Sequence, residues 1–212
     1  IVSAMQAVGF SKQLARIDEL RKAMRTTSDA LTEVIGTSAM TMDTLLDEQK
    51  LQLTLAAMVA AAYAVLSLLG AVFGITYGPI QVRFSEALCL LPFLFPETAW
   101  GLGVGCLIAN LFSPYGVLDI VVGSLATLIA ALITSRCRNV WLAALPPVAC
   151  NMVLVGAVLA YEQAGTSAAF WPAYGLNAAT VGAGEAIACL VLGVLLVKQL
   201  PRIPYFRDRL AS

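Results

Sequence analysis

Apolar and polar positions divide the chain near residue 50. Residues 1–50 are rich in charged side chains, and long apolar runs follow them up to about residue 200. An α-helix needs about 20 such residues to cross a bilayer. The pattern predicts an all-α integral membrane protein whose domain at residues 51–200 has six transmembrane helices, at Leu51–Ile75, Ser85–Phe95, Thr98–Phe112, Val117–Thr134, Val140–Tyr161 and Ala173–Val197.

The second and third predicted spans are shorter than the others and are bounded by proline and glycine. They form either two separate spans or one hairpin of tilted or broken helices. The span count therefore depends on this stretch more than on any other.

The polar segment at residues 1–50 has a helical pattern of its own. Its apolar residues recur at a broken heptad-like spacing, at Leu14, Ile17, Met24, Leu31, Ile35, Met42 and Leu45. This spacing predicts one or two amphipathic cytoplasmic helices that pack on a partner or on the membrane surface. Residues 201–212 are expected to form a cytoplasmic tail.

Composition strengthens the membrane interpretation and excludes several functions. The chain is 59% hydrophobic and only 12% charged, whereas soluble domains carry about 25% charge. Its formal net charge is zero, so no nucleic-acid partner is expected. With no histidine, there is neither a Ser-His-Asp triad nor a histidine-ligated zinc. No GxxxxGK[ST] loop is present, so we expect neither ATP hydrolysis by this chain nor a cofactor.

Basic residues predict the orientation, because cytoplasmic loops of membrane proteins are enriched in Lys and Arg. With six spans, Lys50, Arg136, Arg138 and the basic residues after Val197 all fall on one side. That side is predicted to be the cytoplasm of a prokaryotic cell, with both termini inside and the chain in the plasma membrane. The segments Thr76–Phe84, Ser113–Gly116 and Glu162–Pro172 would then face outside.

Ionisable residues inside membrane spans are costly and are candidates for function. Glu185 is the strongest, because it lies thirteen positions before Lys198, about 20 Å along a helix and well inside the bilayer. Asn177 projects within about 80° of Glu185 on the same helix. The structural alternative for this pair is a hydrogen bond to a neighbouring helix.

Two further acidic positions have open alternatives. Arg83 and Glu86 are three residues apart and either pair with each other or face a solute. Asp119 lies in the first turn of its span, where it either stabilises the helix dipole or binds a ligand. Glu97 and Glu162 are expected to be solvated.

Amides and aromatic rings complete the candidate site. Asn110, Asn151 and Asn177 lie in or beside spans, where an amide can bind a polar heterocycle or bridge two helices. Trp171 and Tyr115 lie on predicted outer loops, where they stack on a planar solute or belong to the interfacial aromatic belt.

Small residues in the first span form two rows with a spacing of four. Such rows let helices approach closely, within the chain or with another membrane subunit. We expect them to be a candidate docking face, formed by Ala56, Ala60 and Ala64 in one row and by Ala57 and Ala61 in the other.

Several long strings, in order, resemble the QueT family. They are "YGPIQVRFSEALCLLPFLFPE", "GCLIANLFSPYGVLDIVVGSLATLIAALIT", "WLAALPPVACNMVLVGAVLAY" and "GEAIACLVLGVLL", and the resemblance covers about residues 54–200. It implies the substrate-binding S component of an energy-coupling-factor (ECF) transporter for queuosine precursors. Such a component has six helices, captures its solute at the outer face and works with a transmembrane coupling subunit and two ATPase subunits. The alanine rows match the family's AxxxA docking feature.

The implied solute is a 7-deazaguanine, a planar heterocycle with a guanine-like edge. We expect Glu185 or Glu86 to bind that edge, Asn110 or Asn151 its carbonyl and Trp171 or Tyr115 its face. Arg83 would lie at the rim of the pocket, and Asp119 would receive a cationic aminomethyl group. The alternatives are an S component for another small vitamin, a non-transporting membrane scaffold and an intramembrane enzyme, although no enzyme motif supports the last.

Overall fold

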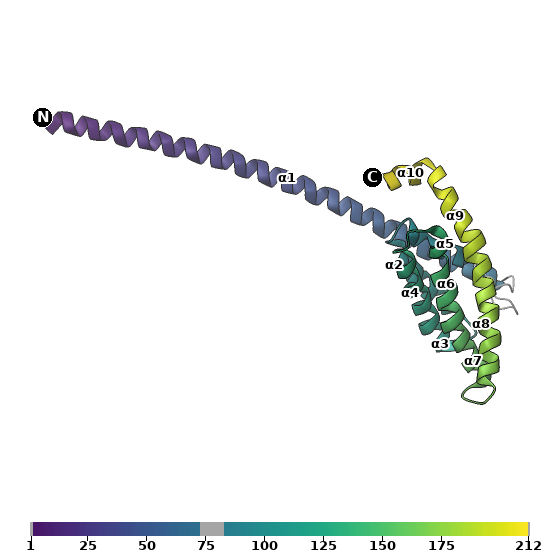
Figure 1. Cartoon of the computed structure of the whole chain (residues 1–212). Coiled ribbons are helices and arrows are strands. Elements are labelled where there is room, and N and C mark those ends of the chain that lie inside the picture. Colours follow the sequence, from purple (N-terminus) through teal and green to yellow (C-terminus); the bar gives the residue numbers. More distant parts are fainter. Residues whose placement is uncertain (1, 73–82, 212) are drawn as a thin grey trace. The chain divides into compact units, whose positions relative to one another are not determined.

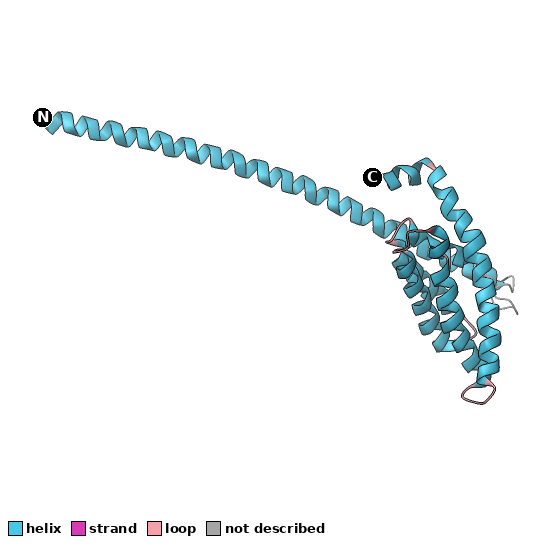
Figure 2. Ribbon diagram, in the orientation of Figure 1, coloured by secondary structure: helices cyan, strands magenta, loops and turns pink. Residues whose placement is uncertain are grey.

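The structure is a computed structural model that describes residues 2–72 and 83–211. Every regular element in this described part is a helix (Figures 1 and 2). Contacts within the chain divide it into one unit up to Lys50 and a second unit from Leu51 onward.

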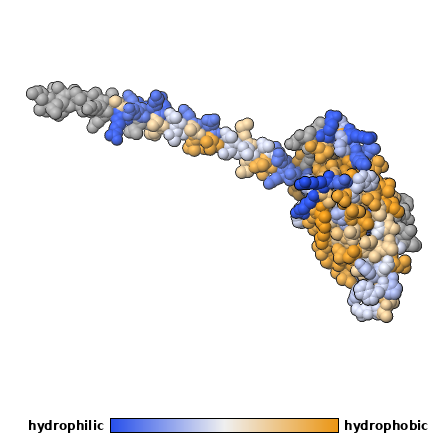
Figure 3. Space-filling model, viewed as in Figure 1, coloured by the Kyte–Doolittle hydropathy of each residue, from blue (hydrophilic) through white to orange (hydrophobic). Residues whose placement is uncertain are grey.

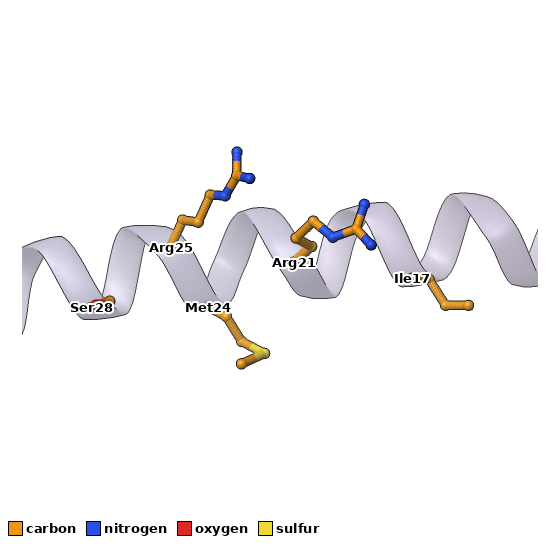
Figure 4. A pocket seen from close by; sticks show the side chains of 5 residues that line it. All are labelled: Ile17, Arg21, Met24, Arg25 and Ser28. Carbon is orange, nitrogen blue, oxygen red and sulfur yellow. The ribbon is translucent and has the colours of Figure 1, made fainter.

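The first unit is a single helical segment. It is the first part of α1 (Val2–Val72), where the sequence predicted one or two helices. From Ala15 to Lys50 every side chain that the structure describes is exposed, the apolar ones included. Figure 4 shows a shallow surface hollow on this helix, where Ile17 and Met24 point to one side and Arg21 and Arg25 to the other. This short stretch is amphipathic, and its packing on a partner or a membrane stays a prediction.

The second unit contains the rest of α1 and all later elements. These are η1 (Phe84–Phe93), α2 (Thr98–Asn110), α3 (Gly116–Leu118), η2 (Asp119–Gly123), α4 (Ser124–Thr134), α5 (Val140–Ala143), α6 (Leu145–Cys150), η3 (Asn151–Val155), α7 (Gly156–Ala164), α8 (Phe170–Ala186), η4 (Ile187–Gly193), α9 (Val194–Gln199), η5 (Leu200–Arg202) and α10 (Pro204–Ala211).

Four helices of the described part are long and apolar enough to cross a membrane. The first is part of α1, and each of the other three is a run of successive short elements that continue into one another. The four helices are Ala15–Val72, Gly116–Thr134, Val140–Ala164 and Phe170–Arg202, and they contain the described parts of the first, fourth, fifth and sixth predicted spans. The end of the first span, at residues 73–75, and most of the predicted outer loop, at 76–82, lie outside the described residues.

The second and third predicted spans form shorter apolar helices. η1 is a 3₁₀ helix of 10 residues with Pro92 inside it, and its tighter winding stretches it to about 20 Å at ~2.0 Å per residue. α2 has 13 residues and also reaches about 20 Å, at ~1.5 Å per residue. Each falls short of the ~30 Å hydrocarbon core.

Small side chains allow α1 and α2 to pack closely. Ala56, Ala60 and Ala64 are buried, whereas Ala57 and Ala61 are exposed. A Cβ added at Gly101 would clash with the carbonyl oxygen of Ala56, and one added at Gly105 would lie 2.6 Å from the carbonyl oxygen of Ala60. The first alanine row therefore packs against α2 within the chain, whereas the second row is exposed on the surface of this unit.

Basic and apolar side chains are separated on the second unit. A surface hollow joins the end of η1, the α4–α5 loop and the end of α9, and both Arg138 and Lys198 line it. Figure 3 shows hydrophilic side chains at this end and hydrophobic ones over much of the visible flank. In Figure 1, α3 and the α7–α8 loop lie at the opposite end. The basic loops therefore gather at one end of an apolar bundle.

Replacing Gly101 with alanine tests the close packing of α1 on α2. Because the new methyl group would overlap the Ala56 backbone, we expect Gly101→Ala to lower the free energy of unfolding by about 1–3 kcal/mol. Thermal unfolding of the purified chain in detergent measures this. The control is Gly175→Ala in α8, where an added Cβ meets nothing within 4 Å. Equal thermal midpoints for the two variants would contradict the close approach.

Candidate solute-binding site

Glu86 of η1 is buried in the apolar interior, with only 1% of its surface exposed. Its carboxylate accepts a hydrogen bond from each of two neighbours. The Tyr63 hydroxyl of α1 donates to Oε1, and the Cys89 thiol donates to Oε2 with an Sγ–Oε2 distance of 2.9 Å. A buried carboxylate is costly without such donors. The Tyr63 contact joins η1 to α1, and Cys89 donates from within η1.

Glu185 of α8 is buried in a connected cluster of polar groups. Asn151 of η3 donates through Nδ2 to Glu185 Oε1 at 3.0 Å. The Cys189 thiol lies 3.8 Å from Glu185 Oε2 and 3.5 Å from the backbone oxygen of Glu86. Cys189 therefore bridges the two glutamates, and this glutamate cluster joins α1, η1, η3 and the α8–η4 helix.

Asp119 of η2 is fully buried and belongs to a second group of polar side chains. The Ser113 hydroxyl donates to its Oδ2 at 2.5 Å, so its donor is a side chain and not a backbone N–H at the helix start. Its Oδ1 is buried and accepts no hydrogen bond from any residue that the structure describes. One acceptor atom is therefore left for a ligand.

Asn110 of α2 lies beside Asp119. Its Nδ2 donates to the backbone oxygen of Asp119 at 3.2 Å and to Cys106 Sγ at 3.4 Å. Gly123 makes room for both side chains, because an added Cβ would lie 2.8 Å from Asn110 Nδ2 and 3.1 Å from Asp119 Oδ1. The amide thus fixes α2 against η2, and both of its donor hydrogens are used.

Arg83 connects the two polar groups. It is half-buried and precedes η1 directly. Its guanidinium lies within electrostatic range of Glu86 and Asp119, and also of Glu185. One guanidinium among three buried carboxyl groups leaves more acceptor oxygens than nearby donors. Such a site suits a ligand that is rich in N–H donors.

Three interruptions of regular α-helix coincide with these polar residues. The π-helical stretches η2 and η3 begin at Asp119 and Asn151, and η4 contains Cys189. Such widened turns are rare in proteins and are frequent at functional sites. Their positions support the view that these buried polar residues form a binding site.

The other predicted site residues have different neighbours. Asn177 exchanges hydrogen bonds with Gln163 of α7, at 2.8 Å and 3.3 Å, and so bridges two helices. Trp171 is 72% exposed and contacts the rings of Phe170 and Tyr174, and Tyr115 packs against the apolar cluster around Val155 and Leu159. Their described contacts connect none of the three to the glutamate cluster.

The family model described as the QueT transporter matches residues 53–202, well over half of the chain. The chain belongs to the QueT transporter family. The resemblance predicted from the sequence is thereby confirmed.

One curated relative is the queuosine precursor transporter QueT of Lactococcus lactis subsp. cremoris (strain MG1363). The chain is 38% identical to it over 73 residues, which is 34% of this chain and 43% of the relative. The alignment thus spans less than half of that relative's length. No solved structure matches the chain.

All residues of the two polar groups lie within the part matched by the QueT transporter family, yet the sequence did not predict several of them. Tyr63, Cys89 and Cys189 donate to the glutamates or lie between them. A tyrosine hydroxyl in the middle of an apolar span needs a partner, and this signal could have identified Tyr63. The thiols carried no such signal, because buried cysteine usually packs as a small hydrophobic residue.

Removing the Tyr63 hydroxyl tests the support of Glu86. In Tyr63→Phe the buried Oε1 of Glu86 loses its donor, so we expect the free energy of unfolding to fall by about 1–3 kcal/mol. Thermal unfolding in detergent measures the loss, and Tyr161→Phe, at a residue that is 48% exposed, is the matched control. Unfolding of both variants at the wild-type temperature would show that the Tyr63–Glu86 hydrogen bond does not stabilise the chain.

Proposed function

We propose that the chain is the substrate-binding S subunit of an ECF-type transporter and captures a 7-deazaguanine precursor of queuosine. The observation that carries this proposal is the group of three carboxylates buried around Arg83 in an apolar bundle. Membership of the QueT transporter family supports the solute class, as does the name of the Lactococcus lactis relative.

The chemistry of the solute fits the glutamate cluster. A guanine-like edge presents a ring N–H and an exocyclic amine, and one carboxylate accepts both. Glu185 accepts hydrogen bonds from one amide and one thiol, whereas a carboxylate has about four acceptor positions. Glu185 therefore keeps acceptor capacity for the solute edge, and Glu86 lies next to it.

The two asparagines are not equally suited to bind the ring carbonyl of the solute. Asn110 uses both hydrogens of its amide on Asp119 and Cys106. Asn151 uses one hydrogen on Glu185, and an amide has two. The second hydrogen of Asn151 is thus the better donor to the carbonyl of a solute held by Glu185.

Asp119 would complete the site for a charged solute. Its Oδ1 has no donor among the described residues, and a buried acceptor gains most from a charged donor. An ammonium group on an aminomethyl side chain is such a donor. Arg83 would balance the remaining negative charge at the rim.

Uptake would depend on partner subunits. The chain has no phosphate-binding loop, so ATP hydrolysis would occur in two cytoplasmic ATPases. The exposed alanine row at Ala57 and Ala61 would dock on the transmembrane coupling subunit. We further propose six spans in the plasma membrane, with η1 and α2 as the two short ones, and place the end carrying Arg138 and Lys198 together with both termini in the cytoplasm.

Replacing Glu185 with glutamine tests the solute site. Gln keeps the shape and the contact with Asn151 but replaces one acceptor oxygen with an N–H donor, so affinity for a 7-deazaguanine should fall about tenfold or more while the chain stays folded. Equilibrium binding to the purified chain measures this, with Glu162→Gln at an exposed position near the end of α7 as the control. Unchanged binding by the Glu185 variant would remove this residue from the site.

Enlarging Ala61 tests the docking face separately. Ala61→Leu should leave solute binding intact and should weaken assembly with the coupling subunit by about tenfold, because a bulky side chain prevents close helix approach. Co-purification with the coupling and ATPase subunits is the measurement. Ala179→Leu, at an exposed alanine of α8, is the control, and equal assembly of both variants would exclude this face.

A further inference from the structure

The basic end of the second unit carries an open hollow of about 490 Å³ between three segments of the chain. These segments are the end of η1, the α4–α5 loop with the start of α5, and the end of α9. This volume is within the range of sites that hold small molecules, about 300–1,000 Å³. The hollow shares no lining residue with the solute site and lies at the end opposite to α3 and the α7–α8 loop (Figure 1).

Two cations line this hollow without a counter-ion. Arg138 and Lys198 are exposed, and neither forms an ion pair with a residue that the structure describes. No acidic side chain is among the residues that line the hollow. Two neighbouring positive charges without a carboxylate attract an anion.

A tryptophan and an asparagine add features of a headgroup site. Lys198 Nζ lies 4.8 Å from the centre of the Trp141 ring, and Trp is enriched at the level of lipid headgroups. Asn139 Oδ1 accepts a hydrogen bond from the Trp141 backbone N–H at 2.8 Å. The side-chain oxygen of Asn139 thus caps the start of α5. The Nδ2 of the same side chain remains available to donate to a bound group.

The opposite wall of the hollow is apolar. Phe93 and Leu94 at the end of η1 line it, together with Val197. These half-buried or buried side chains continue into the hydrophobic interior of the bundle. An anion that occupies this hollow therefore has an apolar surface beside it. A lipid acyl chain can pack on that surface, whereas a free phosphate cannot.

We propose that this hollow binds the phosphate of an anionic phospholipid from the leaflet that it faces, with the phosphate between Arg138 and Lys198 and an acyl chain along Phe93 and Leu94. Basic pockets between helices at the cytoplasmic surface are known to bind anionic headgroups. The site goes beyond the proposed solute transport, and it is tested without any solute.

The test uses the full chain in detergent, titrated with phosphatidylglycerol or with phosphatidylcholine while its thermal midpoint is followed. We expect the wild type to bind phosphatidylglycerol about tenfold or more tightly than phosphatidylcholine. In Arg138→Gln/Lys198→Gln the affinity for phosphatidylglycerol should fall ~30-fold. The matched control, Arg136→Gln/Arg202→Gln, removes the same charge at exposed residues that do not line the hollow, and its affinity should stay within about threefold of wild type.

Three outcomes would overturn the proposal. A wild type with no preference between the two lipids has no anionic-lipid site, and this result does not depend on any variant. An equal loss in the control variant would mean a diffuse surface charge effect. Equal stabilisation by glycerol 3-phosphate, which lacks acyl chains, would mean a site for free phosphate and not for a lipid.

Discussion

The burial of three carboxylates in an apolar bundle is the constraint on which the rest of the second unit depends. A carboxylate removed from water must have donors or a nearby cation. Glu86 has Tyr63 and Cys89, Glu185 has Asn151 and Cys189, and Asp119 has Ser113. Tyr63 ties η1 to α1, Asn151 ties η3 to α8, and the Cys189 thiol reaches the backbone oxygen of Glu86, so the polar groups that would bind a solute also hold the helices around it in place.

Small residues make this arrangement possible. Alanine, glycine and cysteine fill much of the contact between α1, η1 and α2, and their short side chains let polar groups on separate helices come within hydrogen-bond distance. The widened turns of η2, η3 and η4 shift backbone positions near the same polar residues. Close helix packing and local departures from α-geometry thus act together on one site.

The sequence predicted the features that depend on composition and on one helix at a time. The four long apolar helices, the buried Glu185 and the basic end all follow from runs of apolar residues and the position of charges. Pairing between helices could not be predicted, because Asn151 and Glu185 are 34 residues apart and their meeting depends on packing. For the same reason the sequence could not show that Gly101 and Gly105 pack against the alanine row of α1, or that Asn177 pairs with Gln163.

We propose that this buried acidic site binds a 7-deazaguanine. Thermal stabilisation of the purified chain by deazaguanine precursors, guanine, riboflavin, thiamin and biotin is the decisive measurement. A ligand at 100 times its dissociation constant adds about 2.7 kcal/mol of stability, which such a measurement resolves. We expect a shift of the thermal midpoint with deazaguanines alone. A shift with another vitamin would contradict the solute assignment, and a well-folded chain stabilised by none of them would contradict the binding site itself.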